Sequence, residues 1–492
     1  MRFLADDLLE GRETGTRGFD VAAQYVAAQF EAAGLETSMQ PVAFRTARVA
    51  DQAMRIDTTA LTAHKDFILS PSFDQATVDV TAPVAVAGYG IVAPEFHHDD
   101  YKLIDVRGKV AILLTGAPAG FPTDQRAYYS ASTLKLRSAA EHGAVGVLFL
   151  NSRIDERRSP FERIAQQSAM TSMRYVEANG RVADANSLRF SGRISHDAAA
   201  QMFAGSEISV DTMLREAEQN TTYSIALKPS VTIHLQSDLG EAKSENVIGI
   251  LRGSDARLRS DFLVLSAHLD HLGNHQRAGT NDTIYNGAQD NASGVACVIE
   301  IARALAKHPP RRSVIFVAFT GEEKGEQGSR YFARHPPVAK SAVVADVNMD
   351  MPLMLYPLAD LIALGGEHSS LGPAARRAAA AEKLSISPDP LPEEVRFIRS
   401  DQFSFVQEGI PAIHMKSGPH SADPKVDANA VTREWLRTIY HTPADDMSQH
   451  LDFVAGAKYA ETNLRLVRDL ADAPERPKWN RDDFFARTFA RH

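Results

Sequence analysis

Histidines and carboxylates follow several apolar segments in the second half of the sequence. In chain order they are His268 and Asp270 in SAHLDHLG, Asp290 in NGAQDNASG, Glu322 and Glu323 in TGEEKGEQGS, Asp350 in NMDM, and His441 in IYHTPADD. Each has an ordinary structural explanation on its own, such as a helix N-cap for Asp290. Carboxylates that pack together raise one another's pKa unless a cation lies among them. The combined set therefore predicts a metal site.

The types of the donor atoms narrow the choice of metal. Imidazoles and carboxylates without thiolates suit zinc, and manganese and cobalt stay open as alternatives. Two histidines and three carboxylates are enough for two ions if one carboxylate bridges them. Such a pair holds its ions about 3.5–4 Å apart, with an activated water between them.

These side chains need a scaffold, and the second half of the chain predicts one. After about Ser237, apolar segments that are typical of buried strands alternate with helical patterns, of which Ala292–Lys307 is the clearest. The expected strands are Val247–Leu251, Phe262–Ala267, Val314–Phe319, Ala342–Asn348 and Ile410–Met415. The alternation predicts an α/β fold with a mostly parallel central sheet flanked by helices. In such sheets, catalytic groups gather at the carboxyl ends of the strands, which is where this set falls.

The first half of the chain differs in texture. Asp20–Ala33 reads as an amphipathic helix that Asp20 caps and Gly34 ends. Beyond it we expect strands at Val84–Gly90, Lys109–Leu114 and Gly146–Leu150, a helix at Leu134–His142, and a solvated loop at about 151–163. The predicted domains are a discontinuous catalytic domain of residues 1–71 and 237–473, an inserted, smaller β-rich domain of residues 72–236, and a tail of residues 474–492.

Composition excludes several classes of function. The 492 residues carry 53 Lys and Arg against 62 Asp and Glu, a formal net charge of −9. This balance does not favour nucleic acid or an anionic membrane as a partner. Cys297 is the single cysteine, so neither an internal disulfide nor a cysteine zinc site is expected. The sequence contains no run of about 18 apolar residues, so no membrane-spanning helix is predicted. Acidic residues near Met1 predict either an internal protein or one whose leader has been removed.

The ordered motifs resemble those of the dizinc exopeptidase family, which includes bacterial leucyl aminopeptidase, aminopeptidase Y and glutamate carboxypeptidase. The resemblance covers Arg2–Leu35 and roughly Ser244–Leu470. The segments VAGYGIVAPEFHHDDY, DVRGKVAILL and KLRSAAEHGAVGVLFL resemble the protease-associated domain that many members carry as an insertion. The resemblance implies a periplasmic or secreted protein, and a cytoplasmic location stays open.

By position, the resemblance also implies a set of metal ligands. His268 and Asp350 would hold one zinc ion, and Glu323 and His441 would hold the other. Asp290, in its D-x-x-S-G context, would bridge the two ions.

Further residues receive roles from the same resemblance or from their place beside the motifs. Glu322 matches the general base of the family, and Asp270 matches the carboxylate that orients the metal-binding histidine. Asp401 and Arg399, in the segment RSDQFSF, and His414, at the end of a strand, are candidates for the substrate pocket.

The implied function is that of a metal-dependent exopeptidase. The first choice is an aminopeptidase that removes N-terminal residues from peptides through a water bridging two zinc ions. Carboxypeptidase or dipeptidase action is the alternative, because Arg396 and Arg399 offer charge for a carboxylate. Glutaminyl cyclisation and a binding protein without metals are further alternatives. The sequence has no G-x-S-x-G, H-E-x-x-H or P-loop motif, which argues against serine nucleophiles and nucleotide chemistry.

Overall fold

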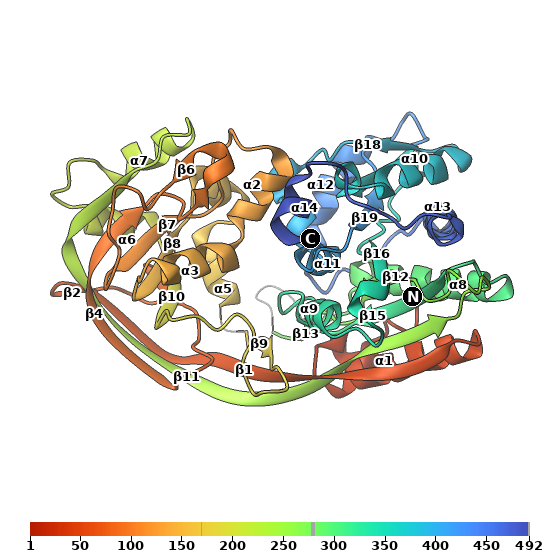
Figure 1. The fold of residues 1–492 in the computed structure, drawn as a ribbon. Coiled ribbons are helices and arrows are strands. Elements are labelled where there is room, and N and C mark those ends of the chain that lie inside the picture. The colour runs from red at the N-terminus through yellow and green to blue at the C-terminus, as the bar shows by residue number, and fades with distance from the viewer. Residues whose placement is uncertain (169, 277–280, 491–492) are drawn as a thin grey trace. The chain divides into compact units, whose positions relative to one another are not determined.

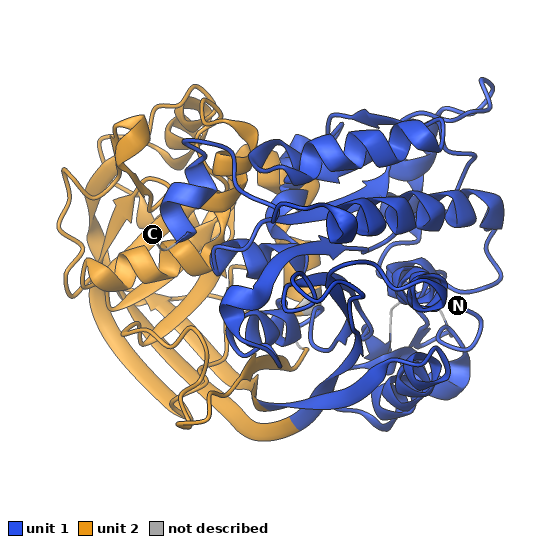
Figure 2. Ribbon diagram, turned by 45° about the vertical axis from the view of Figure 1, so that its right-hand side comes forward, with its two compact units in different colours: residues 1–43, 243–492 blue, residues 44–242 orange. Residues whose placement is uncertain are grey.

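The computed structural model describes residues 1–168, 170–276 and 281–490 (Figure 1). The chain forms two compact units, one of residues 1–43 and 243–492 and the other of residues 44–242 (Figure 2). None of the described helices is both long and apolar enough to cross a membrane. The three predicted domains, including the assignment of residues 72–236 as a protease-associated domain, stay predictions.

The first unit is built on a mostly parallel sheet, as predicted. Its strand order is β18-β17-β19-β16-β12-β15-β11. The bounds are β11 Ser224–Leu251 (residues 243–251 lie in this unit), β12 Phe262–His268, β15 Ser313–Phe319, β16 Val343–Asn348, β17 Asp360–Leu364, β18 Ser385–Ser387 and β19 Ala412–Ser417. β12 runs parallel to β15 and β16, and β16 runs parallel to β19, whereas β11 and β17 are antiparallel to their neighbours β15 and β19. All five predicted strands of this region are confirmed.

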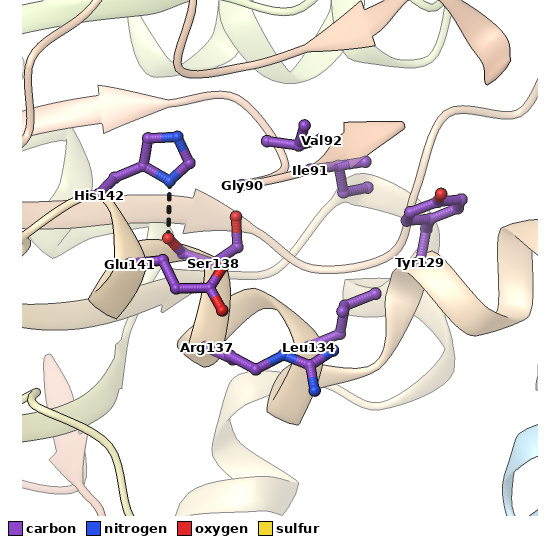
Figure 3. Close-up of a pocket in the computed structure, with 9 residues that line it drawn as sticks. All are labelled: Gly90, Ile91, Val92, Tyr129, Leu134, Arg137, Ser138, Glu141 and His142. Atoms are coloured by element: carbon purple, nitrogen blue, oxygen red, sulfur yellow. Dashed lines mark hydrogen bonds between the residues drawn. The ribbon is translucent and has the colours of Figure 1, made fainter. Parts of the chain in front are cut away.

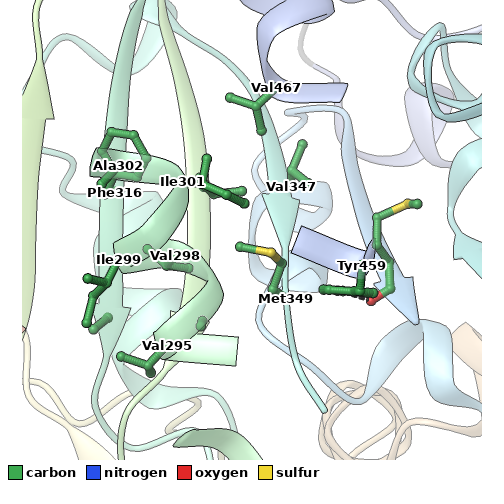
Figure 4. Packing of buried hydrophobic residues seen from close by; sticks show 14 of the residues in the cluster. Val295, Val298, Ile299, Ile301, Ala302, Phe316, Val347, Met349, Tyr459 and Val467 are labelled. Atoms are coloured by element: carbon green, nitrogen blue, oxygen red, sulfur yellow. Dashed lines mark hydrogen bonds between the residues drawn. The ribbon is translucent and has the colours of Figure 1, made fainter. Parts of the chain in front are cut away.

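Helices cover both faces of this sheet because alternate residues of its strands point to opposite sides. Phe316 of β15 packs against Phe30, while Phe319 packs against Phe332 and Phe405. The helices are α1 Arg17–Ala32, α8 Ser293–Lys307, α10 Leu371–Ala381 and α13 Phe453–Asp472 around one core, with α9 Gln327–Arg334 and α11 Gln402–Gln407 at the other face. Figure 4 shows Val295, Val298 and Ile299 of α8 among these buried side chains, and the predicted helix Ala292–Lys307 is confirmed.

The start of α1 differs from the prediction. Thr16, not Asp20, is the N-cap, because its hydroxyl accepts a hydrogen bond from the N–H of Phe19 at 3.4 Å. Asp20 lies inside the first turn, where its charge favours the helix dipole. Gly34 follows the helix with φ +83°, a conformation that favours glycine, as the prediction of a helix end requires.

The second unit has its own parallel strands. They are β4 Thr77–Ala87, β7 Val110–Leu114, β8 Gly146–Leu150 and β10 Phe190–Ile194, with β3 Phe67–Leu69 antiparallel beside β10. Helix α3 spans Ser132–Glu141, which confirms the predicted helix.

The solvated loop predicted at 151–163 is wrong. This segment forms α4 Arg153–Arg158 and the start of α5 Phe161–Gln167. Ser152 caps α4 by accepting a hydrogen bond from the N–H of Asp155 at 3.2 Å. The charged residues of α4 are also favourably placed, with acidic residues in its first turn and basic residues in its last. Their interaction with the helix dipole stabilises the helix.

Candidate metal centre

The predicted donor residues come together at the carboxyl edge of the sheet of the first unit. His268 is the last residue of β12, Glu323 follows β15, and Asp350 follows β16. Since these three strands are parallel, their carboxyl ends lie at one edge. Asp290 lies in an irregular turn at 288–292 that leads into α8, and His441 follows α12 (Ala428–Thr438).

The donor atoms form two groups that share Asp290. His268 Nε2 lies 3.3 Å from Asp290 Oδ1 and 3.3 Å from Asp350 Oδ1. His441 Nε2 lies 3.2 Å from Asp290 Oδ2 and 3.3 Å from Glu323 Oε2. Each oxygen of Asp290 therefore faces a different group, which is the arrangement that a bridging carboxylate needs.

The spacing of these atoms fits a divalent cation. Ligands bound tetrahedrally to zinc at about 2.0–2.2 Å are about 3.3–3.6 Å apart, which the observed distances match closely. His268 Nδ1 lies 3.1 Å from the carbonyl oxygen of Asp270. Because a carbonyl only accepts, Nδ1 carries a proton, and Nε2 is the ring atom that faces the carboxylates and that a metal could bind after losing its own proton. The residues present fit two adjacent metal ions.

Asp270 acts differently from the prediction. Its main-chain carbonyl, not its carboxylate, contacts His268. The carboxylate accepts hydrogen bonds from the N–H groups of Glu322 at 3.1 Å and Glu323 at 3.3 Å and from the hydroxyl of Thr14 at 3.0 Å. Asp270 is only two residues after His268 in the sequence, so its own carbonyl reaches the imidazole ring. Its buried carboxylate instead binds the loop that carries Glu322 and Glu323.

Charges within the cluster shift its pKa values strongly. Burial alone would raise the pKa of Glu323, but His441 and His271 outweigh it and lower the pKa to about 2. Burial would lower the pKa of His441, but Glu323 and Asp290 raise it to about 10. Burial, reinforced by Glu323 and Asp350, raises the pKa of Glu322 well above its usual value. In the metal-free protein this shift favours the protonated, neutral form of Glu322.

Arg12 is a buried residue of this centre that the sequence did not reveal. Its guanidinium donates to the carbonyl oxygens of Leu269 at 2.9 Å, Asn286 at 2.5 Å and Gly287 at 3.1 Å, and also to Leu4. It thus ties the segment between His268 and Asp270 to the turn that precedes Asp290. Burial lowers the pKa of Arg12 to about 10, so the group stays cationic at neutral pH beside the carboxylates.

Two further residues hold the same loops and were also missed. Asn291 accepts from the N–H of Met351 at 3.1 Å and donates to the carbonyl of Met349 at 3.0 Å, so it grips both sides of Asp350. The carboxylate of Asp445 accepts from the N–H groups of Gln289 and Asp290, both at 3.0 Å. The nearest available signals were their positions inside the motifs NGAQDNASG and IYHTPADD.

The three candidates for substrate binding differ in exposure. Asp401 and His414 are fully covered, with exposed fractions of 0% and 1%, whereas the Arg399 side chain is 47% exposed. His414 Nε2 lies 2.9 Å from the carbonyl oxygen of Asp350 and so supports the main chain of a donor residue. Burial raises the pKa of Asp401 to about 8. A substrate-binding role for these three residues stays a prediction.

The second unit contains a separate cavity of about 420 Å³ (Figure 3). Its lining residues are Gly90, Ile91, Val92, Tyr129, Leu134, Arg137, Ser138, Glu141 and His142. His142, the single imidazole of this lining, stacks on Tyr101 at 4.0 Å, and its Nδ1 lies 2.8 Å from the carbonyl oxygen of Ser138. The cavity therefore lacks the convergent metal donors of the first unit.

Comparison with known proteins agrees with the fold. An aminopeptidase from Aneurinibacillus sp. strain AM-1 shares the fold at a TM-score of 0.57 and 20% identity, over 96% of this chain and 94% of that one. A probable zinc metalloprotease of Leptosphaeria maculans is 28% identical over 47% of this chain and 58% of its own length. Aminopeptidase YwaD of Bacillus subtilis is 27% identical over 42% of this chain and 40% of its own length.

The chain thus spans about half the length of these curated relatives. Residues 246–467, which include every predicted metal ligand, match the sequence model of peptidase family M28.

Metal binding by this centre is expected to release protons. His441 has a pKa of about 10 in the metal-free protein, and the pKa of His268 is also raised well above 6.5, so both imidazoles carry protons at neutral pH. A metal must displace those protons, and the apparent affinity should rise about tenfold per pH unit for each proton released between pH 6.5 and 8.5. Calorimetric titration with Zn²⁺ in buffers of different protonation enthalpy measures this; affinity independent of pH contradicts it.

The same groups govern the stability of the metal-free protein. The raised pKa of His441 contributes stability that is fully present below pH 6.5 and lost as the pH rises through about 10. The lowered pKa of Glu323 contributes stability that is present above pH 4.5 and lost as the pH falls through about 2.

The substitution Arg12→Met tests whether the guanidinium holds the donor loops in place. The variant loses all the hydrogen bonds to the loop carbonyls, so we expect its affinity for Zn²⁺ to fall about 10–100-fold, as for other outer partners of metal sites. Arg312→Met is the matched control: Arg312 is equally buried in the same unit, but it binds Asp261 and the carbonyl oxygens of Leu470 and Ala473. Equal loss of Zn²⁺ affinity in both variants argues against the role of Arg12.

Proposed function

We propose that the protein is an exopeptidase that uses two zinc ions, and that it acts as an aminopeptidase on peptides. The observation that carries this proposal is the pair of donor groups that share Asp290 at spacings of 3.2–3.3 Å. His268 and Asp350 would complete one zinc site, and Glu323 and His441 the other. Zinc, when bound there, supplies Lewis acidity toward a carbonyl and makes a water nucleophilic at neutral pH.

Glu322 is the proposed general base. Its neighbour Glu323 belongs to the donor cluster, and Asp270 fixes the main chain of both residues. Glu322 therefore stands beside the reacting water without being a ligand itself. Its carboxylate would accept a proton from the attacking water and later return that proton to the leaving amine. The carboxyl group of Glu322 is half-buried, which limits competition from bulk water.

The name of the Bacillus subtilis relative supports aminopeptidase action. The charges near Glu322 agree, since the carboxylates of Asp350 and Asp401 act on it and an acidic surrounding favours a free amine. Carboxypeptidase action is the second candidate. The observation in its favour is Arg399, whose side chain is half-exposed, close enough to interact with Glu322, and able to neutralise a carboxylate.

The substitution Glu322→Gln tests the assignment of the base. Glutamine keeps the shape but cannot accept the proton, so kcat should fall about 10²–10⁴-fold while two equivalents of zinc remain bound. Peptide hydrolysis and metal content are measured on the same preparation. Glu326→Gln, four residues farther along the same turn, is the control that should keep both. Turnover of Glu322→Gln close to that of the wild type refutes the assignment.

Paired assays distinguish the two kinds of exopeptidase. An aminopeptidase cleaves dipeptides that are amidated at the carboxyl end and leaves N-acetylated dipeptides intact, because it must bind the free amine. A carboxypeptidase shows the opposite pattern. Hydrolysis of neither series by zinc-loaded protein contradicts the proposed function.

A further inference from the structure

His271 is a buried imidazole that none of the roles above explains. It follows Asp270 directly, its exposed fraction is 0%, and neither of its ring nitrogens has a hydrogen-bond partner among the described residues. Its Nδ1 atom lies 2.7 Å from Glu323 Oε1 and 3.9 Å from Asp290 Oδ2. Buried polar groups without partners are rare and energetically costly, so the position of Nδ1 beside two carboxylates needs an explanation.

The ring of His271 is held where it is. The N–H of His271 donates to the carbonyl oxygen of Arg12 at 3.1 Å, which fixes its main chain. Gly287 packs against the ring so closely that a Cβ atom there would lie 2.6 Å from Cδ2 and Cγ of His271. On another side stands the ring of His441, edge-on with centroids 5.7 Å apart. The ring is thus enclosed by these neighbours, and its Nδ1 faces the carboxylates of Glu323 and Asp290.

The contact between His271 and Glu323 is short but lacks the alignment of a hydrogen bond. A different geometry explains it. One donor atom each from His271, Asp290 and Glu323 lie within 4.8 Å of one another, close enough to surround a single ion. Two donors at about 2.1 Å from one zinc ion are about 3.0 Å apart at right angles and about 3.6 Å apart at 120°. The two contacts of Nδ1, at 2.7 Å and 3.9 Å, lie within about 0.3 Å of the two ends of that range.

We propose that His271 is an additional protein ligand of the second metal, bound through Nδ1 beside Asp290, Glu323 and His441. This inference rests on the proposed function, because it presupposes the metal pair. It makes the two sites chemically unequal. The second site then has two imidazoles and two carboxylates, whereas the first has one imidazole, that of His268, and two carboxylates.

The inequality has a consequence for metal choice. Imidazole suits zinc and later transition metals, while carboxylate-rich sites also accept manganese. The second site should therefore hold zinc more tightly, and the first should exchange its ion more readily. Without His271 the sites have equal donor counts, and no such ranking is expected.

The first experiment uses His271→Gln and reads metal binding directly. Cobalt(II) is titrated into metal-free protein while its visible absorption is recorded, and Zn²⁺ affinity is measured by competition with a chelator. Wild type should bind two ions, and the variant should bind one of them about 10–100-fold more weakly with an altered cobalt spectrum. His368→Gln is the matched control: His368 is another buried histidine of the same unit, paired with Asp483 at 2.7 Å, and its loss should change neither reading.

The outcomes separate the two hypotheses. Wild type that binds no divalent ion overturns the proposed function together with this inference. Wild type that binds two ions, combined with an unchanged cobalt spectrum in His271→Gln, overturns the ligation alone, even if the affinity falls. A second measurement needs no variant. X-ray absorption of the fully zinc-loaded wild type should reveal three imidazoles shared between two ions, and two imidazoles would overturn the proposal.

Discussion

Repulsion among buried carboxylates is the constraint on which this structure depends. Asp270, Asp290 and Asp350 are buried at one sheet edge beside the half-buried residues Glu322 and Glu323, where water screens their charges weakly. In the metal-free protein two effects reduce this repulsion. Protonated imidazoles face three of the carboxylates, and burial together with neighbouring charges favours a proton on Glu322. Metal ions would replace those protons with stronger charges at the same positions. The centre thus requires positive charge among its carboxylates, either from protonated imidazoles or from bound metal ions.

The cluster is held together by side chains that bind the main-chain amides and carbonyls of the donor loops. Arg12 binds carbonyls of two donor loops, Asn291 grips the loop of Asp350, and Asp445 accepts the amides of the turn around Asp290. The cation of Arg12 also offsets some of the carboxylate charge without occupying a ligand position. Precision at the site thus comes from segments that are up to several hundred residues apart in sequence.

The scaffold could be predicted from the sequence because its signals are local. Apolar runs mark the strands β12, β15 and β16, and the donors immediately follow these strands, so parallel pairing alone brings them to one edge. The supporting contacts could not be predicted. Arg12 lies 257 residues from Leu269, and nothing in LEGRETGTRG indicates that its guanidinium is buried. The prediction of a solvated loop at 151–163 was wrong for a related reason. Its capping serine and the order of its charges stabilise a helix that the composition alone did not indicate.

Asp290 shows why the rigidity is concentrated in one turn. Its two oxygens face different donor groups, so a rotation of its carboxylate that improves one group spoils the other. The carboxylate of Asp445 accepts from the N–H groups of Gln289 and of Asp290 itself, and the hydroxyl of Ser293 donates to the carbonyl of Gln289 at 2.8 Å. Asn291, the next residue, accepts from the N–H of Gly294 at 3.0 Å and so continues the restraint into α8. The turn that carries the shared carboxylate of Asp290 is thus restrained by hydrogen bonds on both sides of that residue.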